Sequence, residues 1–336
     1  MCRQIKPILF SILLLTAVSN SLPAQVSNLI GLQQSVSELS LELAKSLPLN
    51  ASIGLNWPDA YIGKSFPSLP PHFGAGVTFG FSTMSLPTMK TVAEYLGFEI
   101  PFDQEKLFLP AYAVEARVGG LFLPFDVGVK FGYLSPVGLW GKDIDVNYIL
   151  AGADLRYALI DGKSDPSRFN LSIGFGVNYL SGGISGKVPK PQTLNVAGNY
   201  ITMENPLVNI KWETISVDAK MQISKSLLIL TPFLGIGASH AWSSAGYSVD
   251  SKVTINGSPI SQNYIDAINF LLSHSALENI DVSSTGISSI IQNNAFSFRV
   301  FAGTSFNLLV IKLDLLGIYS ILDSNFAASF GVRFQI

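Results

Sequence analysis

Acidic and basic residues stand two positions apart at several places in the chain, as Glu115 and Arg117 do. This spacing puts both side chains on one face of a β-strand, where they meet the side chains of the neighbouring strands. The sequence therefore predicts a network of ion pairs on the inner face of a curved sheet. The residues expected in it are Glu115, Arg117, Asp126, Lys130, Asp154, Arg156, Asp218, Lys220, Arg299, Lys312, Asp314 and Arg333.

Two interpretations of this network are open. Balanced pairs could fill a narrow interior, because an unpaired charge away from water is costly. The same side chains could instead line an aqueous channel. A closed sheet of about ten strands is only a little wider than one that its own side chains fill. We therefore expect a mostly filled interior.

Residue patterns typical of catalysis are scarce. The three histidines, His72, His240 and His274, show no spacing that suggests a metal site. His240 with Asp250 or Asp145 could form an acid–base pair, and this is the only enzymatic arrangement we consider. We expect a protein that is not an enzyme and that has no cofactor.

The elements that position these residues are strands with a period of two. The last stretch, Phe326 to Ile336, alternates an apolar face with a face that carries Arg333, and it continues to the end of the sequence. The pattern resembles the C-terminal signature of bacterial outer-membrane proteins, although here the last aromatic residue is Phe334. The resemblance implies a location in the bacterial outer membrane, contact with its lipid, and recognition of this strand by the barrel-assembly machinery.

The composition agrees with strands that face lipid. The mean hydropathy is +0.38, yet only 13% of residues are charged, against about a quarter in soluble domains. After the first residues no apolar run reaches the ~18 residues of a membrane helix. The net charge of −2 and the lack of a basic patch argue against a nucleic-acid partner.

These patterns predict an all-β fold, namely a transmembrane antiparallel up-and-down β-barrel over residues 72–336. We count about ten strands, or twelve if residues 49–57 contribute to one more hairpin. Connections would be short on one side and long on the other, as in outer-membrane barrels. The short turns are expected near 123–124, 160–167, 224–226 and 306–308, and the main long loops near 85–108, 184–206 and 245–293.

The residues before the barrel have two parts. Residues 1–24 read as a signal peptide, with Arg3 and Lys6 before an apolar core. Cys2, the only cysteine, would be removed with it. Residues 25–71 combine a helix over 26–47, ended by Pro48, with an extended segment. This part could plug the barrel, or it could be a periplasmic helix packed against the rim.

The predicted loop 245–293 contains apolar residues that need to be buried. They could form a lid or a hydrophobic binding site, for which the candidates are Leu271, Leu272, Ile290 and Ile291. Asn56-Trp57-Pro58-Asp59-Ala60 loosely resembles the Asn-Pro-Ala hatch motif of long-chain fatty-acid transporters, although this barrel is several strands smaller. That resemblance implies an N-terminal hatch and a small hydrophobic ligand.

Two functions follow from these patterns. The first is a transport or channel protein for small molecules, hydrophobic ones included. The second is a structural or surface-interaction barrel with a filled lumen.

Overall fold

The structure of the protein is a computed structural model. It describes residues 23–59, 62, 72–85, 87, 90–91, 106–119, 123–137, 144–161, 168–187, 192–196, 199–274 and 279–336. Residues 1–22 fall outside these ranges, so the signal peptide stays a prediction. Among the described residues, no helix has both the length and the apolar character that a membrane span requires.

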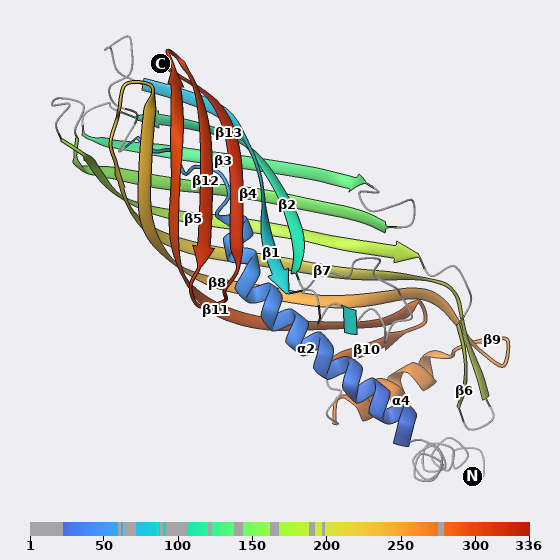
Figure 1. The fold of residues 1–336 in the computed structure, drawn as a ribbon. Helices are drawn as coiled ribbons and strands as arrows, with labels where there is room; N and C mark the ends of the chain where they lie inside the picture. The colour runs from blue at the N-terminus through green and yellow to red at the C-terminus, as the bar shows by residue number, and fades with distance from the viewer. Residues whose placement is uncertain are drawn as a thin grey trace.

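Ten long antiparallel strands of the described chain form one closed wall (Figure 1). Each pairs with its neighbours, and β8 closes the circle by pairing with β11 over the whole span from Leu230↔Phe306 to Asp250↔Gly286. These strands are β1 (His72–Ser85), β2 (Lys106–Gly119), β3 (Phe125–Val137), β4 (Ile144–Ile160), β5 (Asn170–Lys187), β7 (Asn199–Ser224), β8 (Leu230–Ile255), β11 (Gly286–Leu308), β12 (Ile311–Ser320) and β13 (Phe326–Gln335).

Side chains alternate between the two faces of this wall. Outward residues are large and apolar, and Phe175 and Phe79 expose 61% and 57% of their surfaces. Inward residues are small, polar or charged at the end near the C-terminus, as Thr78 and Arg117 are, and largely apolar toward the end with the long strands. A closed antiparallel wall with an apolar outside is the architecture of bacterial outer-membrane barrels, which leaves no strand edge unpaired in lipid. The predicted fold class is confirmed, with ten strands rather than twelve.

The wall is uneven in height. β7 and β8 have 26 residues each and β11 has 23, whereas β12 and β13 have ten. In Figure 1 the long strands extend well beyond the end of the short ones. The high side of the wall ends in smaller elements. These are β6 (Gln192–Val196), β9 (Ser258–Pro259), α4 (Gln262–Leu272) and β10 (Ile280–Ser283).

Two predicted loops are shorter than expected. β8 continues to Ile255 and β11 begins at Gly286, so much of the predicted loop 245–293 is strand. Within the predicted loop 184–206, β5 continues to Lys187 and β7 begins at Asn199. The prediction failed because these parts of the strands extend beyond the apolar zone, where polar residues occupy the outward face as well. Most of the predicted loop 85–108 lies outside the described residues.

The N-terminal segment runs inside the wall. Helix α2 (Pro23–Ala51) contacts residues of β1, β5, β7, β8, β11 and β13, and Figure 1 shows it entering the barrel from the end with the long strands. The predicted stop at Pro48 was wrong: the helix continues to Ala51, since a proline this near the end removes only one helical hydrogen bond. Residues 52–59 form no strand, so the additional hairpin was also wrong.

Candidate functional site

The contacts of the N-terminal segment follow the barrel axis in order. The Ser40 hydroxyl donates to the carbonyl oxygen of Ile291, 3.1 Å away, at the end of the barrel where the long strands project. The backbone N–H of Ile62 donates to Asp126 at 2.9 Å, near the opposite end. Contacts between these two include Asn325 with Ser46 Oγ at 3.0 Å and Asn50 with Ser82 Oγ at 2.9 Å.

The part of α2 in the long-strand half of the lumen meets an apolar lining. Leu39, Leu43 and Leu47 recur at helical spacing and are buried. They belong to one apolar cluster with inward residues of the wall, so burial of apolar surface holds the helix in this half of the barrel. The wall residues in this cluster are Met84, Leu107, Leu109, Ala113, Val146, Tyr148, Leu150, Leu180, Ile184, Val208, Ile210, Trp212, Ala245, Tyr247 and Val249.

A lysine of the wall binds the end of α2. Lys130 Nζ lies 2.6 Å from the carbonyl oxygen of Ala51 and 2.8 Å from that of Ile53. The last carbonyls of a helix lack helical partners and carry partial negative charge, so an ammonium group is well matched to them. Beyond this point the chain turns through Gly54 and Leu55, which have φ values of 86° and 61°.

The turn is held by an arginine–carboxylate network. Asp126 accepts hydrogen bonds from Arg156 Nη2 at 2.6 Å and Nε at 3.0 Å, and it also pairs with Arg117. The Arg156 Nη1 atom donates to the carbonyl oxygens of Trp57 and Asp59, at 2.7 and 2.8 Å. Arg117 donates to the carbonyl oxygen of Leu55 at 3.1 Å. The network therefore binds backbone carbonyls of the segment as well as side chains of the wall.

Trp57 and Asp59 fill the centre of the network. The indole ring is 1% exposed, and the guanidinium carbons of Arg333 and Arg117 lie 4.6 and 5.5 Å from its centroid, within cation–π range. The Asp59 carboxylate pairs with Arg333 at 2.8 Å and with Lys312 at 3.2 Å. These contacts attach the segment to the last two strands of the barrel.

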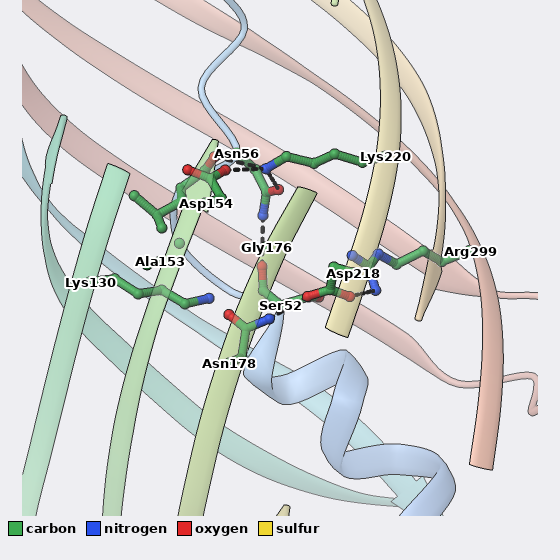
Figure 2. A pocket seen from close by; sticks show the side chains of 12 residues that line it. Ser52, Asn56, Lys130, Ala153, Asp154, Gly176, Asn178, Asp218, Lys220 and Arg299 are labelled. Atoms are coloured by element: carbon green, nitrogen blue, oxygen red, sulfur yellow. Dashed lines mark hydrogen bonds and ion pairs between the residues drawn. The ribbon is translucent and has the colours of Figure 1, made fainter. Parts of the chain in front are cut away.

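A small polar cavity lies beside this turn (Figure 2). On one side Lys220 pairs with Asp154 at 2.9 Å, and on the other Arg299 pairs with Asp218 at 3.0 Å. Asn56 of the segment points between them, and its side chain donates to the carbonyl oxygen of Ser52 at 2.7 Å (Figure 2). The charges that surround the cavity are thus already engaged with one another.

All twelve residues of the predicted network lie on the inner face of the wall, and ten of them bind the N-terminal segment directly or through one partner. Glu115, for example, accepts a hydrogen bond from the backbone N–H of Leu55. Asp218 and Arg299 instead pair with each other and contact Asn178 and Ser239 of the wall. The sequence interpretation did not assign roles here to Trp57 or Asp59. A signal was present, because the twelve residues comprise five acids and seven bases. Asp59 and the helix-end carbonyls supply part of the missing negative charge.

The structure separates two of the four proposed lid residues. Ile290 and Ile291 follow each other on β11 and point to opposite faces, and Ile290 is 65% exposed whereas Ile291 packs against the lumenal cluster. Leu272 ends α4 on the projecting part of the chain, and the side chain of Leu271 lies outside the described residues. Strand alternation separates residues that the linear sequence places together.

The acid–base pair considered for His240 is not formed. The His240 ring lies on the outward face, edge to face with Trp242, with the ring centroids 4.6 Å apart. Asp250 stands ten positions further along the same strand, which corresponds to about 33 Å. Asp145 pairs with Ser185 on the β4–β5 ladder, level with the β7–β8 pair Asn209↔Ser248, so it also lies far from His240.

One family model matches most of the barrel-forming part of the chain. A family model described as Lsa36-like matches residues 125–336, which is well over half of the chain. The chain belongs to the Lsa36-like family. The family match begins at the first residue of β3, so it includes eight of the ten barrel strands and leaves out α2, β1 and β2. A search among curated proteins finds no match.

Several solved outer-membrane proteins show a distant likeness. The outer membrane protease OmpT from Escherichia coli has a TM-score of 0.41 at 9% identity, over 81% of this chain and 100% of that one. Ail, the attachment invasion locus protein of Yersinia pestis, has 0.28 at 8%, over 80% and 100%. The Pseudomonas putida toluene transporter TodX has 0.27 at 8%, over 90% and 96%. TM-scores this low carry no information about function.

Proposed function

We propose that the protein is a sealed outer-membrane barrel that works through its outer surface rather than through its lumen. One observation carries this proposal: residues 49–59 and Ile62 lie inside the barrel and are bound there by the ion network. Arg117, Arg156 and Arg333 are each no more than 2% exposed, and all three contact the segment. A segment held by so many charged hydrogen bonds is part of the resting fold.

The outside of the barrel supports the same proposal. The apolar outward face ends at a row where Ile215 pairs with Trp242, an aromatic of the kind that marks the membrane interface. Beyond Trp242 the outward residues of β8 are Ser244, Gly246, Ser248 and Asp250. On β8 this part of the wall is polar on the outside, as expected of a surface that stands in water and is available to other molecules. It is built from the longest strands of the described chain.

Planar-bilayer conductance tests whether the barrel is sealed. The purified full-length protein is expected to show no steady open current. The variant Trp57→Ala/Asp59→Ala, which removes the side chains that fasten the segment, is expected to show opening events. The variant Asp266→Ala, altered on the exposed face of α4, serves as the control and should stay closed. A steady open current through the unaltered protein would refute the sealed barrel.

Photo-cross-linking on intact cells tests the outer surface. A photoreactive residue at Phe270, which is 66% exposed on α4, is expected to capture a macromolecule outside the membrane. The same residue at Phe175, which faces lipid, is the control and should capture lipid only. If positions on the outer surface capture no more protein or polysaccharide than Phe175 does, the surface-interaction function is wrong.

Transport of small hydrophobic molecules is the second candidate. The observation that favours it is the apolar lining of the long-strand half of the lumen, including Leu109, Leu150 and Ile210, which would suit an apolar molecule if α2 moved away. Uptake of the hydrophobic fluorophore N-phenylnaphthylamine by proteoliposomes distinguishes the two candidates. Transport predicts faster uptake than in protein-free liposomes, whereas the sealed barrel predicts an unchanged rate.

A further inference from the structure

We infer that the barrel displays its own N-terminal helix, so that the part of α2 before Leu39 lies on the outer side of the membrane. This inference rests on the direction of the chain through the barrel, and it goes beyond the proposed function. It holds whether the outer wall binds a partner or not.

The direction of α2 is fixed by its contacts. The carbonyl oxygen of its last residue, Ala51, binds Lys130 in the half of the lumen that contains the arginine–carboxylate network. Its earlier residue Ser40 binds Ile291 and Asn293, which belong to the long-strand end of β11. The helix therefore runs inward from the end with the long connections. In outer-membrane barrels that end faces the outside of the cell.

The depth of Ser40 shows that the helix has already left the membrane at this point. Trp242 marks the outer edge of the apolar zone and pairs with Asn294. Ser40 contacts Ile291, three residues beyond Asn294, which corresponds to about 10 Å along the strand. Leu39 and Leu43 lie beside Ala245 and Tyr247, which are also beyond Trp242. Residues before Leu39 thus extend further outward still.

The outer part of α2 is open to solvent. Gln34, Ser37 and Glu38 are exposed, and the Gln34 side-chain amide donates a hydrogen bond to the Glu38 carboxylate at 3.1 Å. Figure 1 shows this part of α2 near the projecting elements and far from the C-terminus, which marks the other end of the barrel. An impermeant reagent outside the cell should therefore reach it.

Cysteine labelling of the full chain tests the inference. Ser37→Cys and Gln34→Cys are each compared with Ser258→Cys, on the long-strand end, and with Leu309→Cys, in the turn between β11 and β12 at the opposite end. Intact cells are treated with a charged maleimide, which does not cross a bilayer. The labelled fraction is then divided by the fraction labelled in denaturant. The unsubstituted protein, whose only cysteine, Cys2, lies in the expected signal peptide, gives the background labelling.

Ser37→Cys and Gln34→Cys are expected to label as Ser258→Cys does, at least about tenfold above Leu309→Cys, because a charged reagent is excluded from the bilayer. Labelling of Ser37→Cys and Gln34→Cys only after the cells are opened would overturn the inference. So would labelling of Leu309→Cys on intact cells with protection of Ser258→Cys, since the barrel would then be inverted. Normalisation to the denatured protein gives each variant a defined outcome.

Discussion

The guanidinium of Arg333 stacks on the ring of Trp57, 4.6 Å from its centroid, so the last strand of the barrel holds the segment that precedes the first strand. Strand β13 also pairs with β1 over nine residue pairs, from Gly74↔Gln335 to Ser82↔Ala327. The strand that closes the barrel therefore also fastens its interior. Closure of the wall and seating of the N-terminal segment are consequently linked, and the effects of mutations at these places should be linked as well.

Removal of the Trp57 ring should loosen the segment. Trp57→Ala is expected to lower the free energy of unfolding by about 3–5 kcal/mol, because a large buried side chain and its cation–π contacts are lost. Trp57→Phe keeps an aromatic face toward Arg333 and should cost less than half as much. Urea unfolding in detergent micelles, followed by far-UV circular dichroism, measures both. Equal losses would show that the aromatic face is unimportant.

Neutralisation of Asp126 should leave two buried arginines without their shared partner. Asp126→Asn is expected to cost about 3–5 kcal/mol, the usual penalty for breaking a buried ion pair from one side. Asp266→Asn makes the same chemical change on the exposed face of α4, and surface substitutions of this kind usually change stability by less than about 0.5 kcal/mol. The same unfolding experiment compares them. A similar small effect of both variants would contradict the buried network.

A methyl group at Gly74 should collide with Trp57. A Cβ at this position would lie 2.6 Å from Cζ3 of the indole, whereas a Cβ at Gly317 would meet Phe326 at 3.6 Å, an ordinary contact. Gly74→Ala is expected to cost about 1–3 kcal/mol, as overpacking does, and Gly317→Ala much less. In the Trp57→Ala background the cost of Gly74→Ala should largely disappear. An additive double-mutant cycle would show that the two residues do not interact.

Loss of the Lys130 ammonium should free the end of α2. Lys130→Met keeps most of the side-chain volume but removes the donors to the carbonyl oxygens of Ala51 and Ile53. We expect faster amide hydrogen exchange in residues 47–56, measured by mass spectrometry. Lys252→Met, on the exposed outer part of β8, is the control and should leave this exchange unchanged. Unchanged exchange in both variants would refute the role of Lys130 as a cap.

An arginine scan of the outward face should locate the membrane. Ala219→Arg, midway along the apolar zone of β7, is expected to cost about 2–4 kcal/mol, as it does for a cation at the middle of the bilayer. Ser244→Arg lies just beyond Trp242, beside Glu213, and should be nearly neutral. Unfolding is measured in liposomes, since detergent does not impose a fixed thickness. A large penalty at Ser244 would move the membrane boundary outward.

The sequence predicted much of the barrel because the membrane imposes a period of two. Where the outward face must be apolar, as from Phe169 to Tyr179, the alternation is plain and the strand is found. Outside the membrane this constraint ends, so residues of β8 beyond Trp242 look like a loop although they remain in register with β7 and β11. The charged residues of the lumen were predicted for the same reason, because they stand at alternate positions of the strands, on the face that otherwise carries small residues.

The partners of these charges could not be predicted in the same way. Contacts between the wall and residues 49–62 join positions far apart in the sequence, such as Asp59 and Arg333. The segment has no periodic pattern there. Many of its hydrogen bonds are accepted by backbone carbonyls, and since every residue has a carbonyl, the sequence does not show which of them bind the wall. The apolar character of Ile290 and Ile291 likewise says nothing about which face each takes until the strand is placed.

Because the height of the wall differs around the barrel axis, the two sides of the molecule are not equivalent within the plane of the membrane. Strands of 26 residues on one side and ten on the other differ in length by about 50 Å. A macromolecule that approaches the barrel along the cell surface from the side of β12 and β13 meets strands of ten residues. A macromolecule that approaches from the side of β7 and β8 meets strands of 26 residues, which project much further. The barrel therefore has a front and a back, although its membrane-spanning part is a simple ring.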